Sequence, residues 1–203
     1  MSRDGSATSL VLVGVGGQGI LLAAQIAARA ALSAGYDVKT NEVHGMAQRG
    51  GSVVAQVRYG EKVFSPLVPE GTARVLMSLE RIEALRFAGF LAPDGLAVVS
   101  SQAIIPVTVS SGQAKYPADA EDRLKRVFPR LAYIDAVGVA EKLCDIRVAN
   151  VVLLGTVSTA IALPGECWTE AIAQCVKPRF RDINVRAFEE GKRLAPTPRA
   201  MRA

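Results

Sequence analysis

A run of glycines between an apolar segment and a helix-forming segment constrains the fold of this 203-residue chain more than any other feature. Residues 10–13 (LVLV) are continuously apolar, as is typical of a strand buried on both faces of a parallel sheet. Residues 20–34 are rich in Ala and Leu and contain no Pro, so they predict a helix, and residues 37–42 predict the next strand. Strand, glycine turn, helix and strand form a βαβ unit, which predicts an α/β fold.

The glycine turn has the sequence GVGGQG and contains the G-x-G-x-x-G spacing, after a predicted strand and before a predicted helix. Glycines let backbone N–H groups approach a phosphate, which then lies at the positive N-terminus of the helix. The same turn could serve only to pack the helix on the strand, and the spacing alone leaves both alternatives open. The candidate cofactor-binding residues of this turn are Gly14, Gly16, Gly17, Gln18 and Gly19.

A second polar loop, EVHGMAQRGG, follows the second predicted strand, at the edge where doubly wound sheets bind ligands. Glu42 is placed where an acid that binds a ribose would be expected, or it is a strand-end acid that faces solvent. Arg49 can bind a carboxylate or phosphate through both arms of its guanidinium, and His44 can transfer a proton near neutral pH. Alternatively, the polar side chains only satisfy the loop's own backbone. The candidates that face a catalytic site are His44, Gln48 and Arg49, and the candidate cofactor-binding residues are Glu42, Arg49, Gly50 and Gly51.

The rest of the chain predicts one doubly wound, Rossmann-like domain over residues 8–195, with a mostly parallel sheet and helices on both faces. Residues 52–59 alternate and are β-branched, so they predict a strand, and residues 62–65 could return as its hairpin partner. Residues 148–195 predict a helical C-terminal segment. Its first part, residues 148–163, is apolar all round, which indicates either a buried helix or an interface with a partner. Residues 196–203 contain two prolines and two arginines and predict a flexible tail.

Charge and cysteine content exclude several classes of protein. The formal net charge is +5 without a block of like charges, so no nucleic-acid partner is expected. No apolar run is long enough to span a membrane. Cys144, Cys167 and Cys175 form no C-x-x-C pair, and His44 is the only histidine, so no metal site is expected from this chain alone. Free thiols of this kind predict a reducing cytoplasm.

The two glycine-rich motifs, together with FSPL at residues 64–67 and SLE at residues 78–80, resemble one enzyme family. They resemble the small (beta) subunits of indolepyruvate ferredoxin oxidoreductases and, more broadly, the gamma domain of the 2-oxoacid:ferredoxin oxidoreductase superfamily. The resemblance covers roughly residues 8–190. The HGMAQRGG version of the second motif resembles the arylpyruvate branch.

The resemblance implies a subunit of a complex that decarboxylates an arylpyruvate, such as indolepyruvate, on thiamine diphosphate and Mg. Such a complex passes electrons through iron–sulfur clusters to ferredoxin and transfers the acyl group to coenzyme A. The large (alpha) subunit is then expected to carry the thiamine diphosphate and the clusters, since this chain has neither a cluster-type cysteine pattern nor a thiamine diphosphate motif. The resemblance further implies that the glycine turn holds the phosphates of coenzyme A and that residues 44–51 face the shared active site.

Two other functions explain part of the pattern. A stand-alone NAD(P)-dependent Rossmann dehydrogenase would use the glycine turn and Glu42, but it leaves residues 44–51 unexplained. A structural subunit whose glycine turn binds no ligand is the second alternative.

Overall fold

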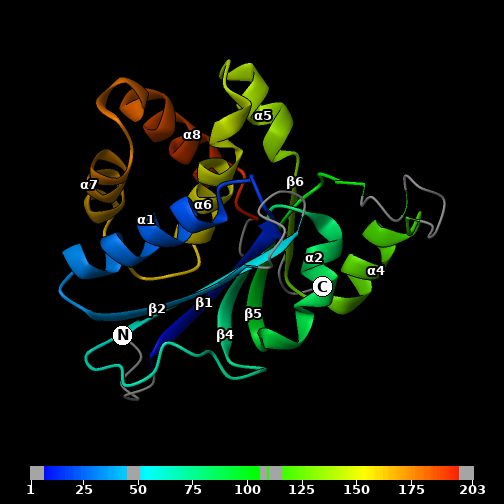
Figure 1. Ribbon diagram of the computed structural model, residues 1–203, viewed down its shortest axis with the longest axis horizontal. Coiled ribbons are helices and arrows are strands. Elements are labelled where there is room, and N and C mark those ends of the chain that lie inside the picture. The colour runs from blue at the N-terminus through cyan, green and yellow to red at the C-terminus, as the bar shows by residue number, and fades with distance from the viewer. Residues whose placement is uncertain (1–6, 45–50, 106–108, 110–115, 197–203) are drawn as a thin grey trace.

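The computed structural model describes residues 7–44, 51–105, 109 and 116–196 of the chain. In this part of the chain, six strands form one sheet in the order β2-β3-β1-β4-β5-β6, and helices cover both of its faces (Figure 1). The predicted α/β class is thereby confirmed. The strands are β1 (Thr8–Val15), β2 (Asp37–His44), β3 (Ser52–Gly60), β4 (Ala73–Ser78), β5 (Leu91–Ser100) and β6 (Leu131–Ile134).

The sheet is parallel on one side of β1 and antiparallel on the other. β1, β4, β5 and β6 run parallel to one another, whereas β3 pairs antiparallel with both β1 and β2. The predicted βαβ unit is present, but its two strands are not adjacent, because β3 lies between β1 and β2.

The helices form two layers of unequal size (Figure 1). One hydrophobic cluster joins the sheet to α1, α5, α6, α7 and α8, and a second joins the opposite face to α2 and α4. The predicted helical segment therefore packs on the same sheet face as α1. The helices are α1 (Ile20–Ser33), α2 (Arg81–Arg86), α4 (Ala120–Val127), α5 (Ala136–Lys142), α6 (Ala149–Ser158), α7 (Gly165–Cys175) and α8 (Arg181–Arg193), with 3-10 turns at Ala88–Phe90, Ile146–Val148 and Pro178–Phe180.

Strand β1 is buried on both faces, as its apolar run predicts. Leu10 and Leu12 point into the cluster beneath α1, while Val11 and Val13 point into the cluster beneath α2. None of the four side chains is more than 2% exposed. The strand is therefore central to the core as well as to the sheet.

The predicted hairpin strand at residues 62–65 is wrong, because this segment has no strand partner. This segment and the residues after it are held by side chains of β2 and β3 instead. The Val63 N–H donates to Asp37 Oδ2 of β2 at 2.8 Å. The Arg58 guanidinium donates from Nη1 to the carbonyls of Ser65 and Leu67 at 3.0 Å each, and the Val68 N–H donates to Gln56 Oε1 at 2.8 Å. These side-chain bonds satisfy the backbone that a sheet ladder would otherwise satisfy.

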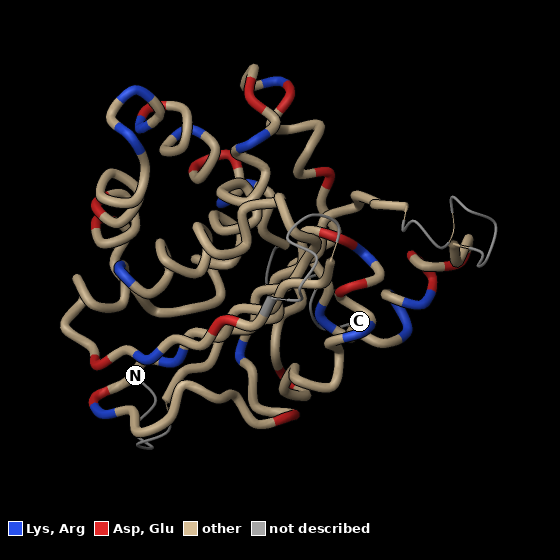
Figure 2. The backbone as a smooth tube through the Cα atoms, viewed as in Figure 1, with Lys and Arg blue, Asp and Glu red and all other residues tan. Residues whose placement is uncertain are grey.

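The apolar segment from residue 148 is a buried helix, one of the two alternatives that its pattern allows. Every residue of α6 from Ala149 to Val157 is buried within this chain, and Trp168 of α7 is buried beside Phe188. Charged residues lie mainly on the outer helices and loops, and α6 carries none (Figure 2). The expectation that this apolar surface forms an interface with a partner is therefore wrong. Of the predicted tail, residues 197–203 lie outside the described residues.

Helices α6 and α8 touch through their backbones at two glycines. A Cβ added at Gly191 would lie 1.8 Å from the Val152 carbonyl oxygen, and one added at Gly155 would lie 2.0 Å from the Phe188 carbonyl oxygen. The Thr156 hydroxyl also donates to the Gly191 carbonyl at 2.6 Å. The close approach of these helices therefore requires glycine on both sides.

We expect Gly191→Ala to lower the free energy of unfolding by about 3 kcal/mol or more, because the added methyl group must separate two backbones. Urea denaturation measures this loss. Gly89→Ala is the matched control, since a Cβ there meets no atom within 4 Å. Its effect should stay within about 0.5 kcal/mol. Equal stability of the two variants would contradict the backbone contact between α6 and α8.

Candidate functional site

The predicted site residues gather at the carboxyl edge of the parallel strands. The chain leaves β1 through the glycine turn to α1 on one face of the sheet, and it leaves β4 to α2 on the opposite face. Adjacent parallel strands whose connections diverge in this way mark a topological switch point, where α/β sheets bind ligands. β1 and β4 are such a pair.

The glycine turn brings α1 to this edge with its N-terminus open. Gly17 has φ +101° and Gly19, the N-cap residue, has φ +79°, a backbone region that favours glycine. No side chain among the described residues caps α1. The N–H groups of its first turn therefore point toward the edge without a side-chain acceptor, as in phosphate-binding helices. Gly14 lies beneath the turn, within β1.

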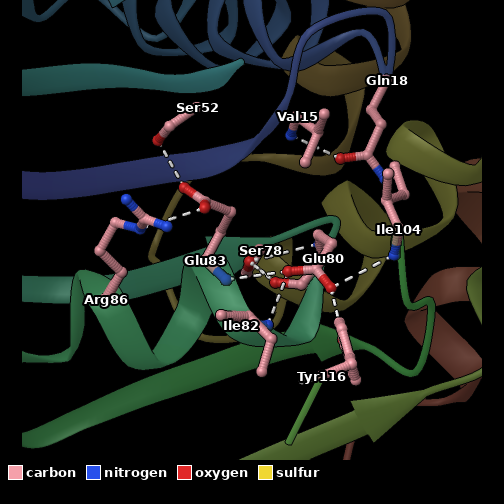
Figure 3. A network of polar contacts seen from close by, with 10 residues as sticks. All are labelled: Val15, Gln18, Ser52, Ser78, Glu80, Ile82, Glu83, Arg86, Ile104 and Tyr116. Carbon is pink, nitrogen blue, oxygen red and sulfur yellow. Dashed lines mark hydrogen bonds and ion pairs between the residues drawn. The ribbon is translucent and has the colours of Figure 1, made fainter. Parts of the chain in front are cut away.

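Gln18 is committed to bonds within the fold. Its Oε1 accepts from the Val15 N–H at 2.7 Å, and its Nε2 donates to the Leu79 carbonyl and to Gln102 Oε1 at 2.8 Å each. The side chain thus joins the ends of β1, β4 and β5, and Figure 3 shows its carbonyl directed at Val15. The structure therefore places this predicted cofactor-binding residue as a clamp across the switch point.

The second loop returns to the glycine turn at its end. The Gly16 N–H donates to the Gly51 carbonyl at 2.8 Å, so the two predicted motifs meet there. Beside this contact, the Ser52 hydroxyl donates to Glu83 Oε2 of α2 at 2.5 Å (Figure 3). The loop starts after His44, which ends β2 opposite Val53. Gln48, Arg49 and Gly50 lie outside the described residues.

Glu42 lies apart from the glycine turn. It is exposed on the edge strand β2, opposite Ala55 of β3, and Ala55 is in turn opposite Leu12 of β1. Two strand spacings, roughly 10 Å, therefore separate the backbone of Glu42 from that of β1. In a dinucleotide-binding unit the strand with the ribose-binding acid is adjacent to the first strand. The structure does not bring Glu42 and the glycine turn together.

Glu80 is a buried carboxylate at this edge that our sequence analysis did not single out as a site residue. Its Oε2 accepts from the N–H groups of Ile82 and Glu83 at 2.6 and 3.0 Å and so caps α2. Its Oε1 accepts from the Tyr116 hydroxyl at 2.7 Å and from the Ile104 N–H at 3.4 Å (Figure 3). An acid two residues after a buried strand, just before a helix, is the one sequence signal for this role.

Tyr116 connects Glu80 to a cation. Its hydroxyl accepts from Arg81 Nε at 2.9 Å, and the guanidinium lies 4.9 Å from the centre of the ring. Burial raises the pKa of the Tyr116 phenol to about 12; the Arg81 bond lowers this pKa and the Glu80 carboxylate raises it. The phenol therefore stays protonated at neutral pH and can donate to Glu80.

Asn150 is a second buried polar residue that the sequence analysis did not single out. Its Nδ2 donates to the Gly19 carbonyl at 3.0 Å, and its Oδ1 accepts from the Val151 N–H at 2.9 Å. Because Asn150 is in the first turn of α6, this bond fixes the start of α6 against the start of α1. The partners are 131 residues apart, so no local pattern indicates the contact.

Metal-binding clusters and membrane spans were sought in the described part of the chain. No group of three or more His, Cys, Asp or Glu side chains there could hold a metal ion. Within the same residues, no helix combines the length and apolar character that crossing a membrane requires. Cys144 is exposed, Cys167 buried and Cys175 half-buried, and all three are free thiols.

Comparison with known proteins gives consistent matches over nearly the whole chain. The sequence profile of the pyruvate ferredoxin/flavodoxin oxidoreductase family matches residues 9–194. Indolepyruvate oxidoreductase subunit IorB of Thermococcus kodakarensis is 43% identical, over 92% of this chain and 95% of that protein.

Solved structures share the fold at lower sequence identity. The gamma subunit of a keto/oxoacid ferredoxin oxidoreductase from Geobacter sulfurreducens matches with a TM-score of 0.69 and 21% identity, over 93% of this chain and 98% of that chain. A 2-oxoglutarate:ferredoxin oxidoreductase from Magnetococcus marinus, with 2-oxoglutarate, coenzyme A and succinyl-CoA bound, also matches. Its TM-score is 0.69 at 20% identity, over 94% of this chain and 31% of that chain. The same fold thus occurs as a separate subunit and as one part of a longer chain.

Because the Gln18 side-chain amide joins the ends of three strands, we expect its removal to lower the free energy of unfolding. Gln18→Ala leaves the Val15 N–H, the Leu79 carbonyl and the Gln102 side chain without this partner, and we expect unfolding to become easier by roughly 1–3 kcal/mol. Gln25→Ala, on the exposed side of α1, removes the same amide without such bonds and should change stability by less than about 0.5 kcal/mol. Thermal denaturation measures the stability of both variants. If Gln18→Ala is as stable as the unmodified protein, the hydrogen bonds of Gln18 do not hold the three strand ends together.

Proposed function

The chain belongs to the pyruvate ferredoxin/flavodoxin oxidoreductase family, and we propose that it is the small subunit of an arylpyruvate-oxidising complex. The reaction is the oxidative decarboxylation of an arylpyruvate, such as indolepyruvate, to the acyl-CoA with reduction of ferredoxin. The identity to an indolepyruvate oxidoreductase subunit over nearly the whole chain supports this branch of the family. Residues 8–195 then form one gamma-type domain of a cytoplasmic enzyme.

The large (alpha) subunit is the proposed partner, and it carries the thiamine diphosphate, Mg and iron–sulfur clusters. Cluster ligation commonly takes four cysteine thiolates, and this chain has three cysteines in different environments. The chain's own share of the work is to bind coenzyme A and to complete the active site, and ferredoxin accepts the electrons at the large subunit.

The open N-terminus of α1 carries the coenzyme A proposal. Among the described residues, three helices begin at the carboxyl edge after parallel strands: α1, α2 and α5. Glu80 caps α2 and Asp135 caps α5, whereas α1 has no side-chain cap among the described residues. Its first-turn N–H groups are suited to the phosphates of coenzyme A. The coenzyme A that the Magnetococcus marinus enzyme binds is consistent with this assignment.

The second loop provides the side chains that reach the reaction. Because Gly51 bonds to Gly16, a ligand on the glycine turn lies beside the end of this loop. We therefore keep His44, Gln48 and Arg49 as the candidates that face the shared active site. Gly50 and Gly51 allow the backbone to approach the ligand closely.

The alternative of a stand-alone NAD(P)-dependent dehydrogenase fits the geometry less well. β3 separates β2 from β1, so Glu42 is displaced from the position of a ribose-binding acid. Gln18 also spans the switch point between β1 and β4. The alternative of a structural subunit without a ligand does not explain why α1, unlike α2 and α5, has no side-chain cap among the described residues.

Two substitutions of Gly17 that differ in charge but hardly in shape test whether phosphates bind at the start of α1. Gly17→Asp places a carboxylate at the start of α1, so coenzyme A binding to the assembled complex should weaken by about tenfold or more. Gly17→Asn has nearly the same shape and the same backbone strain without the charge, and it should bind clearly better than Gly17→Asp. Calorimetric titration with coenzyme A measures both. Equal affinities of the two variants would move the phosphates away from α1.

Arg49 offers a test of the second loop. Arg49→Ala should lower turnover of the complex by roughly 30- to 1,000-fold, because a desolvated anion loses a charge-assisted partner. Size exclusion should show the complex intact. Co-purification with a cluster-bearing large subunit establishes the assembly first. Normal kinetics in an intact variant complex would remove Arg49 from the site, and dissociation would assign it to the interface.

A further inference from the structure

An arginine at the carboxyl edge has a guanidinium without an acid partner. Arg81 is the first residue of α2, which begins after β4, the strand beside β1. Its side chain is half-buried, and within the described part of the chain it forms no ion pair with a carboxylate. Arg147, shortly before the start of α6, instead donates to both carboxylate oxygens of Asp145 at 2.8 and 2.6 Å. Arg81 is therefore a cation that this edge can offer to a ligand.

Tyr116 holds this guanidinium in place. Its hydroxyl accepts from Arg81 Nε at 2.9 Å, and the guanidinium lies 4.9 Å from the centre of its ring. Hydrogen bonds to the hydroxyls of Tyr116 and Tyr133 raise the pKa of Arg81, which is charged in any case. A guanidinium has five N–H donors, so the terminal nitrogens keep donors beyond those that the tyrosines take.

The nearby Glu80 carboxylate does not take the place of a ligand. It accepts from the Tyr116 hydroxyl and from three backbone N–H groups, two of them in the first turn of α2. Its negative charge is therefore stabilised by four donors, and its link to Arg81 runs only through the Tyr116 hydroxyl. Arg81 is fixed by this arrangement without a direct ion pair.

Gln102 connects Arg81 to the glycine turn. The Arg81 N–H donates to the Gln102 carbonyl at 3.2 Å, and Gln102 Oε1 accepts from Gln18 Nε2 at 2.8 Å. Because the Val15 N–H can only donate, Gln18 must turn its oxygen to Val15 and its NH2 group to Gln102. Gln102 then has its own NH2 group left, which finds no acceptor among the described residues. Donors therefore extend from the glycine turn across the switch point to Arg81.

Coenzyme A carries two separate anionic groups, the pyrophosphate and the 3′-phosphate of its ribose. The open start of α1 suits one of them. The backbone N–H groups at the starts of α2 and α5 already bond to Glu80 and Asp135, so they are not available for the other. A guanidinium matches a terminal phosphate, because two parallel N–H groups can donate to two of its oxygens.

We infer that Arg81 binds the 3′-phosphate of coenzyme A while the pyrophosphate lies at the start of α1. The NH2 group of Gln102 lies between the two phosphate positions. This inference rests on the proposed coenzyme A site and gives that site its specificity. Arg81 then distinguishes coenzyme A from nucleotides that have a pyrophosphate but no 3′-phosphate.

Two ligands that differ only in this phosphate test the inference on the unmodified protein. Calorimetric titration of the assembled complex should show that 3′-dephospho-coenzyme A binds roughly ten- to hundredfold more weakly than coenzyme A. Equal affinities would overturn the role of Arg81 and leave the coenzyme A site itself in place. If neither ligand binds, the coenzyme A assignment fails and this inference fails with it.

Variants of Arg81 assign the difference to its side chain. Arg81→Gln should weaken coenzyme A binding by roughly ten- to hundredfold and leave 3′-dephospho-coenzyme A within about twofold of its original affinity. Arg81→Lys keeps the charge without the planar fork, so its coenzyme A affinity should lie between the two. Arg186→Gln, on the exposed side of α8, should change neither affinity.

A merely structural role of Arg81 would weaken the binding of both ligands equally, and that result would overturn the inference. If Arg81→Gln does not assemble, Arg81→Lys still decides. A complex of that variant that binds coenzyme A as tightly as the unmodified complex, or that loses both ligands to the same extent, would contradict a bidentate contact with the 3′-phosphate.

Discussion

The exit of the chain from β1 is the constraint on which the other parts of the structure depend. β1 is a central strand of the sheet and is buried on both faces. The connection from its end to the start of α1 is only a few residues long. Glycine conformations at Gly17 and Gly19 make this turn possible, and one side-chain amide, that of Gln18, holds it against the ends of β4 and β5. The position of α1, the openness of its N-terminus and the contact with Gly51 all follow from this turn.

The antiparallel strand β3 gives the fold its difference from a nucleotide-binding Rossmann unit. It enters between β1 and β2 and pairs with both along their length. The strand that would carry a ribose-binding acid is thereby moved to the edge of the sheet. The same arrangement places the end of β2 and the start of β3 at the carboxyl edge, where the Gly51 carbonyl accepts from the Gly16 N–H of the glycine turn. The position of β3 therefore separates the two strands of the dinucleotide pattern and, through Gly51, brings the end of the second loop to the glycine turn.

Local sequence patterns predict much of this fold but few of the hydrogen bonds that join residues far apart in the sequence. The apolar run at residues 10–13 and the Ala-rich segment after the glycines predict β1 and α1, because both depend on near neighbours in sequence. The alternating residues 52–59 predict a strand, yet nothing local says that it pairs antiparallel with β1. Glu80 and Asn150 were missed for the same reason, since their partners Tyr116 and Gly19 lie 36 and 131 residues away. The predicted hairpin strand is wrong because side chains of β2 and β3, rather than a strand ladder, bind the backbone of residues 63–68.

The central place of β1 has a consequence for how the protein is made. β1 is the first strand of the chain, but both of its neighbours, β3 and β4, come later, and Thr8 pairs with Tyr59. At 5–20 residues per second, roughly 3–10 s separate the synthesis of these two residues. Helix α1 can shelter one face of β1 during this interval, whereas the other face waits for α2. A nascent chain of this protein therefore carries an apolar strand with two free edges, and its folding yield depends on what shields that strand until β3 arrives.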